Sequence, residues 1–188
     1  MPFAITLRLD DAAADRVSDL WHILAAQGLS HDAIRLGYPA HLTLAICPDD
    51  VPGSLLEDAI EALGELQAMP LTLSSLGIFV GQPAVVFLAP IVTVDLLSLH
   101  GKLLDALGDL PIQSHYRRTN WVPHVTLAKD IQAPETAIAA FHSVTMPITG
   151  ILEKIEVIHF RPVRVLHSHK LNRLPVSPPS SPRSGRPN

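Results

Sequence analysis

Two pentapeptides of this chain each place a hydroxyl two residues after an imidazole. The sequence HLTLA at positions 41–45 returns as HVTLA at positions 124–128. Both copies lie in apolar stretches typical of β-strands, in which side chains alternate between the two faces. The histidine and the threonine of each copy therefore share one face, and the apolar residues take the other. Because the second copy also keeps the apolar residue between them and the Leu-Ala pair that follows, chance is a poor explanation for the repeat.

The chemistry of such a pair of motifs is acid–base catalysis on an anion. If a pseudo-two-fold axis relates the two strands, their polar faces line one cleft. One imidazole can then accept a proton near neutral pH while the other donates one. The threonine hydroxyls can donate hydrogen bonds to a charged oxygen held between them. A phosphodiester fits this arrangement. One such motif alone is more typical of a partly buried polar pair, and the repetition favours the catalytic interpretation.

The two motifs resemble the His-x-Thr/Ser-x motifs of the two-histidine (2H) phosphoesterase superfamily, which includes 2'-5' RNA ligase-like proteins and cyclic nucleotide phosphodiesterases. Pro123, directly before the second histidine, also resembles the family pattern. The resemblance implies that His41 and His124 are the catalytic acid and base. It further implies that Thr43 and Thr126 bind the phosphate, and that neither a metal nor a cofactor takes part.

Two departures from the family pattern leave the subfamily open. The first motif continues as ICP at positions 46–48, where the RNA ligase-like subgroup has Phe-Leu-Gly. The family's basic residue before the second motif is replaced by Asn120-Trp121, with Arg117 and Arg118 slightly upstream. We expect Arg117, Arg118 and Trp121 to form a lip that binds phosphate and stacks on a base. The alternative is a solvated loop with a buried tryptophan.

The order strand–helix–motif strand–helix–strand occurs twice, at about 2–79 and 84–170, which predicts an internal duplication. The expected strands lie at 3–9, 38–46, 71–79, 85–88, 121–129, 148–160 and 163–169. We predict an α+β fold with two pseudo-symmetric lobes, each a small, mostly antiparallel sheet with helices, around a central groove. The preference over a parallel, doubly wound sheet rests on the family resemblance.

Capping residues predict where the helices begin. Asp10 or Asp11 is expected to cap the first helix and Thr93 a later one. Ser54 and Glu57 form the pattern of a capping box. We predict a single domain at 1–174. The last residues, 175–188, are rich in Pro, Ser and Arg and predict a disordered tail.

The composition and the single cysteine indicate in which cellular compartment the protein acts. The chain is 47% hydrophobic and has a mean hydropathy of +0.27. The longest apolar stretch, 77–99, is nevertheless broken by Gln82, Pro83, Pro90 and Asp95. No basic and apolar leader is recognisable, and a lone Cys47 cannot form an internal disulfide. We therefore expect a cytoplasmic protein without membrane association, in which Cys47 is a packed thiol.

The net charge indicates which kind of substrate the protein binds. The net charge is −4, and the tail holds two of the 14 basic residues and none of the 18 acidic ones, so the folded part is more acidic still. Duplex-binding proteins normally carry a basic footprint. We therefore expect a small nucleotide or an RNA terminus as substrate, no duplex DNA, and a monomer.

Two alternative functions remain open. A nucleotide or RNA-end binding module could keep the cleft without turnover. His167 and His169 share a strand face and could serve a metal-dependent hydrolase, but the sequence offers no third ligand at a convincing spacing.

Overall fold

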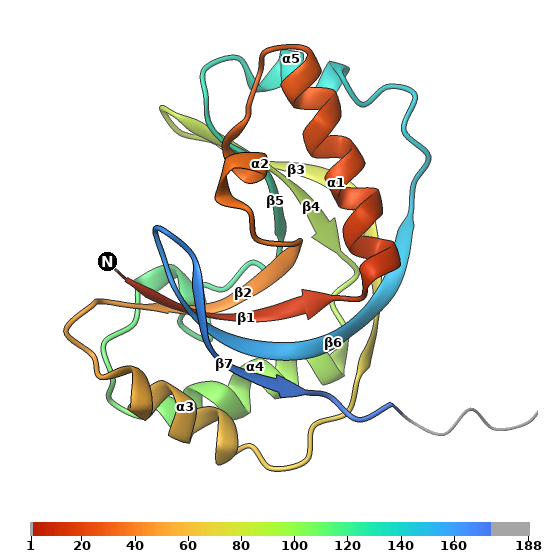
Figure 1. The fold of residues 1–188 in the computed structure, drawn as a ribbon. Helices are drawn as coiled ribbons and strands as arrows, with labels where there is room; N and C mark the ends of the chain where they lie inside the picture. The colour runs from red at the N-terminus through yellow and green to blue at the C-terminus, as the bar shows by residue number, and fades with distance from the viewer. Residues whose placement is uncertain (1, 174–188) are drawn as a thin grey trace, which may run out of the picture.

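Seven strands form one sheet, in which every pair of neighbouring strands is antiparallel (Figure 1). The computed structural model describes residues 2–173, and the expected tail at 175–188 lies outside them. The strand order is β2-β1-β6-β3-β4-β5, with β7 paired to β6. The strands are β1 (Phe3–Leu9), β2 (His41–Cys47), β3 (Met69–Phe79), β4 (Ala84–Pro90), β5 (Val125–Ile131), β6 (Ile148–His159) and β7 (Arg164–Lys170). The helices are α1 (Asp11–Ala26), α2 (Asp32–Leu36), α3 (Gly53–Glu61), α4 (Val94–Leu107) and α5 (Pro134–Ala139), with a 3-10 turn, η1 (Ser114–Tyr116).

The two halves of the chain exchange their last strands. The order β2-β1-β6 in one half of the sheet matches β5-β4-β3 in the other. Strand β3 therefore lies beside β4, and β6 lies beside β1. Residues 69–73 of β3 also pair with 148–152 of β6 and so join the two half-sheets. The predicted α+β class and antiparallel pairing are confirmed, and the parallel alternative is wrong. The exchange means that neither expected half, 2–79 or 84–170, forms a lobe from its own strands alone.

Helix starts follow the local capping chemistry in two of three predicted cases. The Asp10 side chain accepts a hydrogen bond from the Ala13 amide at 3.0 Å, and Thr93 caps α4 through the Leu96 amide at 3.2 Å. The capping box predicted at Ser54 is wrong. Pro52 occupies the N-cap of α3, so Ser54 already lies inside the first turn, and no side chain caps this helix.

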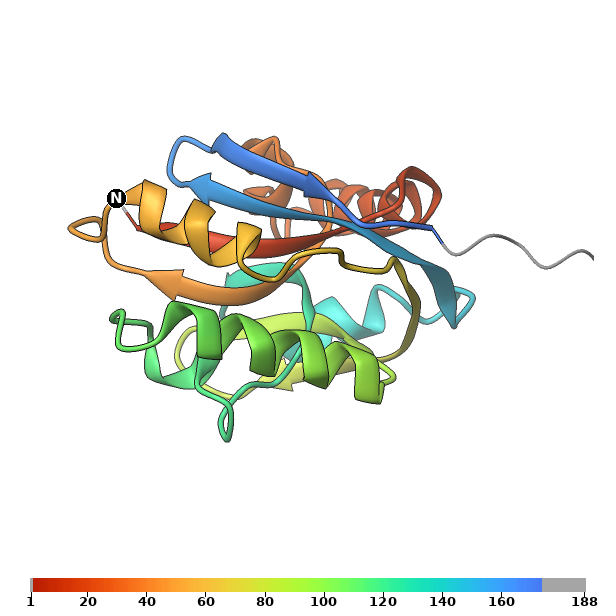
Figure 2. The same cartoon turned by 90° about the horizontal axis from the view of Figure 1, so that it is seen from below.

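Helices cover both faces of the sheet. Figure 1 shows α1 and α2 above the curved sheet and α3 and α4 below it, and Figure 2 shows α3 beside α4. The short helix α2 was not expected from the sequence. No helix within residues 2–173 has both the length and the apolar character needed to cross a membrane.

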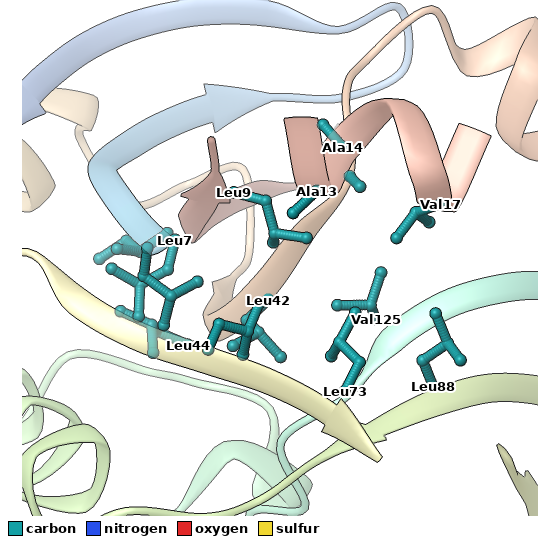
Figure 3. Close-up of a cluster of buried hydrophobic side chains, with 14 of the residues drawn as sticks. Leu7, Leu9, Ala13, Ala14, Val17, Leu42, Leu44, Leu73, Leu88 and Val125 are labelled. Carbon is teal, nitrogen blue, oxygen red and sulfur yellow. The ribbon is translucent and has the colours of Figure 1, made fainter. Parts of the chain in front are cut away.

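The hydrophobic core packs against the apolar face of the two motif strands. Leu42 and Leu44 of β2 are fully buried, and Val125 of β5 is nearly so, in one cluster with Val17 of α1 and Leu88 of β4 (Figure 3). Burying a side chain of this size contributes about 1.5–3 kcal/mol. With these residues fixed in the core, the alternate residues of each motif strand must face the opposite side.

Candidate active site

The structure brings the four motif residues together. His41 and Thr43 of β2 line one cavity with His124, which directly precedes β5, and Thr126 of β5. We call this the central cavity. The other polar residues of its wall are Asp32, Tyr38, Tyr116, Lys129 and Arg161.

Each motif strand carries a bulge at the same place. In β2, Ile5 and Thr6 of β1 pair with Ala45 and Thr43, so Leu44 is the extra residue. In β5, the corresponding pairs skip Leu127, between Thr126 and Ala128. The Leu-Ala pair that both pentapeptides share is thus the bulge itself. A bulge re-aims the residues after it. Here it turns the fifth residue after each histidine, Ile46 or Lys129, into the cavity wall.

Both catalytic candidates are anchored in the same way. Nδ1 of His41 lies 2.9 Å from the carbonyl oxygen of Pro39, and Nδ1 of His124 lies 2.8 Å from that of Val122. A carbonyl only accepts, so each Nδ1 must carry the hydrogen. Nε2 of each ring is therefore the nitrogen left free to accept or deliver a proton.

Aromatic rings surround the two imidazoles. Phe79 meets the ring of His124 edge-on at 4.8 Å, and Phe87, stacked on Phe79, lies 5.2 Å from it. A Cβ on Gly77 would come within 2.4 Å of the Phe87 ring, so the glycine makes room for this stack. On the other side, the Tyr38 ring lies 4.8 Å from His41.

The surroundings favour the neutral form of both histidines. Burial lowers the pKa of His41 from 6.5 to about 4, against the opposing effect of its hydrogen bond to Pro39. Burial also lowers the pKa of His124, and the Lys129 charge adds to the effect on both rings. An anion bound between them would reverse part of this shift, because it stabilises the protonated ring.

Tyr38 is the centre of a buried polar network behind His41. Its hydroxyl donates to Oε2 of Glu156 at 2.6 Å and also bonds to the Thr6 hydroxyl at 2.8 Å. Ser168 donates to the other carboxylate oxygen at 3.1 Å, and Arg8 lies 3.4 Å from Oε2. The desolvated tyrosine next to a carboxylate has a strongly raised pKa. Tyr38 is therefore a fixed, neutral wall of the cavity.

The predicted lip is only partly at the site. Trp121 lines a second cavity, and its indole donates to the main-chain oxygen of Thr43 at 3.0 Å while the ring stacks on His100. Neither Arg117 nor Arg118 lines either cavity. Arg118 is instead held by α4, through the Gly101 carbonyl at 2.9 Å and the Asp105 carboxylate at 2.7 Å.

The cationic groups of the central cavity are Lys129 and Arg161, which sequence reasoning did not assign to the site. Arg161 forms two hydrogen bonds with Asp32, at 2.6 and 3.1 Å, and lowers the pKa of that carboxyl. A strict alternation of side chains hides Lys129, because it lies an odd number of residues after His124 and the strand changes register between them. Arg161 could have been found only as part of a basic patch near the last strand.

The second cavity, which we call the side cavity, adjoins the first. His124, Tyr116 and Lys129 line both. Its remaining wall residues are Phe79, Val85, His115, Asn120, Trp121 and Val122. Burial raises the pKa of the Tyr116 phenol to about 12, opposed by a hydrogen bond with Thr43, so the phenol is neutral. An aromatic wall with one amide is a surface on which a planar ring can stack.

Three other residues that the sequence offers as a candidate nucleophile or as metal ligands lie outside these cavities. Cys47 is buried, and burial raises the pKa of its thiol to about 11, which fits a packed residue and not a nucleophile. His167 and His169 belong to β7 and line neither cavity, so they cannot supply a metal to this site.

Comparison with known proteins identifies the family. Residues 9–163 match the model of the 2'-5' RNA ligase superfamily. No curated protein matches the sequence. TT0787 of Thermus thermophilus has the same fold, with a TM-score of 0.61 at 18% identity, over 91% of this chain and 98% of that one. E. coli LigT in complex with ATP has a TM-score of 0.58 at 18% identity, over 90% and 97% of the two chains. Its complex with 3'-AMP gives 0.57 at 17% identity, over 90% and 96%.

This chain belongs to the 2'-5' RNA ligase superfamily, because the family model spans most of its length. The predicted recognition is thereby confirmed.

Proposed function

We propose that this protein is a metal-independent phosphoesterase that hydrolyses a 2',3'-cyclic phosphate or a related phosphodiester of a nucleotide or RNA end. The observation that carries the proposal is the matched pair of histidines in one cavity, each with Nδ1 bound to a carbonyl, which leaves Nε2 as the nitrogen that can exchange a proton. Two such groups provide a base and an acid without a bound metal.

The proposed reaction uses the four motif residues directly. Nε2 of one histidine removes a proton from water, whose oxygen forms a bond to phosphorus. The bond from phosphorus to one ribose oxygen breaks, and the other histidine donates the Nε2 proton to that oxygen. This second ring carries a proton on both nitrogens, a form that the bound anionic substrate stabilises. Thr43 and Thr126 donate hydrogen bonds to the non-bridging oxygens as negative charge grows on them. The product is a phosphomonoester with a free ribose hydroxyl.

The histidines exchange roles according to which way the substrate lies. With the 5'-hydroxyl of a second RNA in place of water, the same ring opening breaks the bond from phosphorus to the 3'-oxygen and leaves the two RNAs joined through a 2'-5' phosphodiester. Each histidine is expected to contribute about 10²–10⁴-fold to the rate, as acid–base groups usually do.

The walls of the two cavities suggest how a nucleotide lies. Lys129 and Arg161 are placed to attract the phosphate in the central cavity, in the role first expected of Arg117 and Arg118. The base then stacks in the side cavity against Trp121 or Phe79. The LigT structures that contain ATP and 3'-AMP show that a protein of this fold binds small nucleotides. We propose that the chain acts in the cytoplasm as a monomer, on a small nucleotide or RNA terminus.

The test is hydrolysis of the four 2',3'-cyclic nucleotides and of an RNA with a cyclic-phosphate end, with EDTA present throughout. The intact chain is compared with His41→Ala, His124→Ala and the double variant, and the product is identified as a 2'- or 3'-phosphate. Turnover that each single variant reduces by about 10²-fold or more supports the proposal. Activity that survives His124→Ala within a few-fold would exclude it.

A folded chain without turnover would favour the binding module. In that case nucleotide titration into the intact chain, compared with Lys129→Gln, shows whether the cavity still takes a ligand.

A further inference from the structure

On the face of the sheet away from both cavities, a carboxylate meets two imidazoles. Glu61 is the last residue of α3, and His167 and His169 lie two residues apart on β7, which contacts α3. No residue of α3 or β7 lines the central or the side cavity. Figure 1 shows α3 beneath the sheet near β7, whereas α1 and α2 lie above it. This cluster is therefore separate from the proposed catalytic site.

The ligand atoms already lie close to the spacing that a zinc ion requires. Oε1 of Glu61 is 3.0 Å from Nε2 of His167 and 4.0 Å from Nδ1 of His169. All three ligand atoms lie within 4.8 Å of one another. In a tetrahedral site with bonds of about 2.0–2.1 Å, neighbouring ligands are about 3.3 Å apart. The Glu61 side chain is 59% exposed, so it can rotate to equalise these distances.

The nitrogen at the centre of the cluster lacks a hydrogen bond. Nε2 of His167 is buried, and no atom of the described residues, 2–173, hydrogen-bonds to it. Oε1 of Glu61 lies 3.0 Å away without forming a hydrogen bond to it. A buried polar atom without a hydrogen bond calls for an explanation, and a bound ion between this nitrogen and the Glu61 carboxylate supplies one.

Charge favours a cation at this point. Carbonyl groups give the end of a helix a partial negative charge. Helix α3 ends at Glu61 and has no basic residue in its last turn. The Glu61 carboxylate adds a negative charge, which a divalent cation would neutralise. Nitrogen ligands select zinc and its transition-metal neighbours over magnesium and calcium.

We infer that Glu61, His167 and His169 form a zinc site that clamps the end of α3 to β7, with a fourth position open to water. β7 is an edge strand held only by its pairing with β6 among the named strands of the described chain. Since Glu61 is far from the two histidines in the sequence, the unfolded chain binds the ion less well, and zinc stabilises the folded protein. The role is structural, and the reaction in the central cavity does not depend on it.

The experiment is calorimetric titration of Zn²⁺ into the full chain, stripped with EDTA and dialysed, at neutral pH. Thermal unfolding is followed with and without the ion. We expect one Zn²⁺ per chain and a higher midpoint temperature. Glu61→Gln and His169→Asn should each weaken binding by more than about 100-fold, beyond the 10–100-fold typical of residues that only support a ligand.

Two controls separate this site from other histidines. His22 is an exposed histidine on α1, and His22→Asn should bind as the intact chain does. His124→Asn should also retain the zinc, because His124 lies in the central cavity. Two results would overturn the inference: no stoichiometric binding by the intact chain, or binding that survives Glu61→Gln and His169→Asn but is lost in His124→Asn. In the second case the ion lies between the motif histidines.

Discussion

The indole N–H of Trp21 donates a hydrogen bond to the main-chain oxygen of Thr126 at 3.1 Å. Trp21 belongs to the first half of the chain and Thr126 to the second motif. The reverse contact joins Trp121 of the second half to the main-chain oxygen of Thr43, at 3.0 Å. Each motif strand is therefore held at its threonine by a tryptophan from the other half. Each half of the chain thus helps to position the motif threonine of the other half.

Trp121→Phe is expected to lower both stability and activity. The substitution keeps an aromatic ring but leaves the Thr43 carbonyl without its donor, which typically costs about 1–3 kcal/mol of unfolding free energy. Because small displacements of a positioning group are expensive in catalysis, kcat should fall by about 10-fold. Urea unfolding and cyclic-nucleotide hydrolysis measure the two effects. Trp21→Phe should lower stability and kcat in the same way. If neither variant loses activity, the two tryptophan hydrogen bonds do not position the motif threonines.

The substitutions Thr43→Val and Thr126→Val remove each hydroxyl group while keeping the shape of the side chain. Valine has nearly the same volume as threonine but offers no hydrogen bond to a phosphoryl oxygen. We expect kcat/KM to fall by about 10²-fold for each, near the loss seen when one oxyanion donor is removed. A serine at either position keeps the hydroxyl group, so Thr43→Ser and Thr126→Ser should retain most of the kcat/KM of the intact chain.

The matched control for these variants is Thr72→Val on β3, away from both cavities. An equal loss of kcat/KM in this control would show that the effect is structural.

The lowered pKa values of three histidines predict how the stability of the protein depends on pH. Burial lowers the pKa of His41, His100 and His124 below their ordinary 6.5 in the folded protein, to about 4 for His41. The unfolded chain therefore binds more protons between these values. Their contribution to stability is complete above pH 6.5 and is lost as the pH falls toward 4.

Thermal unfolding of the protein without substrate should thus show a midpoint that falls across this window. His41→Gln should flatten the curve, whereas His22→Gln, on the exposed side of α1, should not. Inorganic phosphate should raise the midpoint more at the acid end, because it stabilises protonated rings in the cavity. A midpoint independent of pH across this window would mean that the histidines are not desolvated.

The sequence predicts which face of its strand each motif residue occupies, because that signal is local. A period of two in a strand whose apolar face is buried determines which side His41 and Thr43 occupy, and the same holds for the second motif. Caps at Asp10 and Thr93 are likewise determined by neighbouring residues.

Features that depend on long-range pairing were not predicted. The exchange of β3 and β6 follows from partners far apart in the chain, and no local pattern encodes it. Lys129 lies after the bulge at Leu127, which breaks the alternation of side chains that the sequence predicts. Glu61 meets His167 only after α3 and β7 have packed together. Spacing can reveal ligands on one element but not the partner that another element supplies.

Lys129→Gln should weaken the capture of anions without removing the catalytic groups. Lys129 lines both cavities, and its charge helps to lower the pKa of His41 and His124. We expect KM for a cyclic nucleotide to rise by about 10-fold, since one unit of charge near a partly buried anion is worth roughly 1–4 kcal/mol. The dependence of KM on salt should shrink as well. Lys102→Gln on α4, which lines neither cavity, is the control and should leave KM unchanged.

Tyr38→Phe separates the two tasks of Tyr38, which touches His41 with its ring and Glu156 with its hydroxyl. The phenylalanine keeps the ring, so kcat should change by less than a few-fold. Loss of the hydroxyl leaves the Glu156 carboxylate, which is 5% exposed, without its shortest hydrogen bond. Unfolding free energy should then fall by about 1–3 kcal/mol, the usual cost of an unpaired buried group. Tyr38→Leu removes both contacts and should lower stability and kcat together. If Tyr38→Phe instead abolishes turnover while its stability is unchanged, the hydroxyl acts on the substrate and Tyr38 is a catalytic residue.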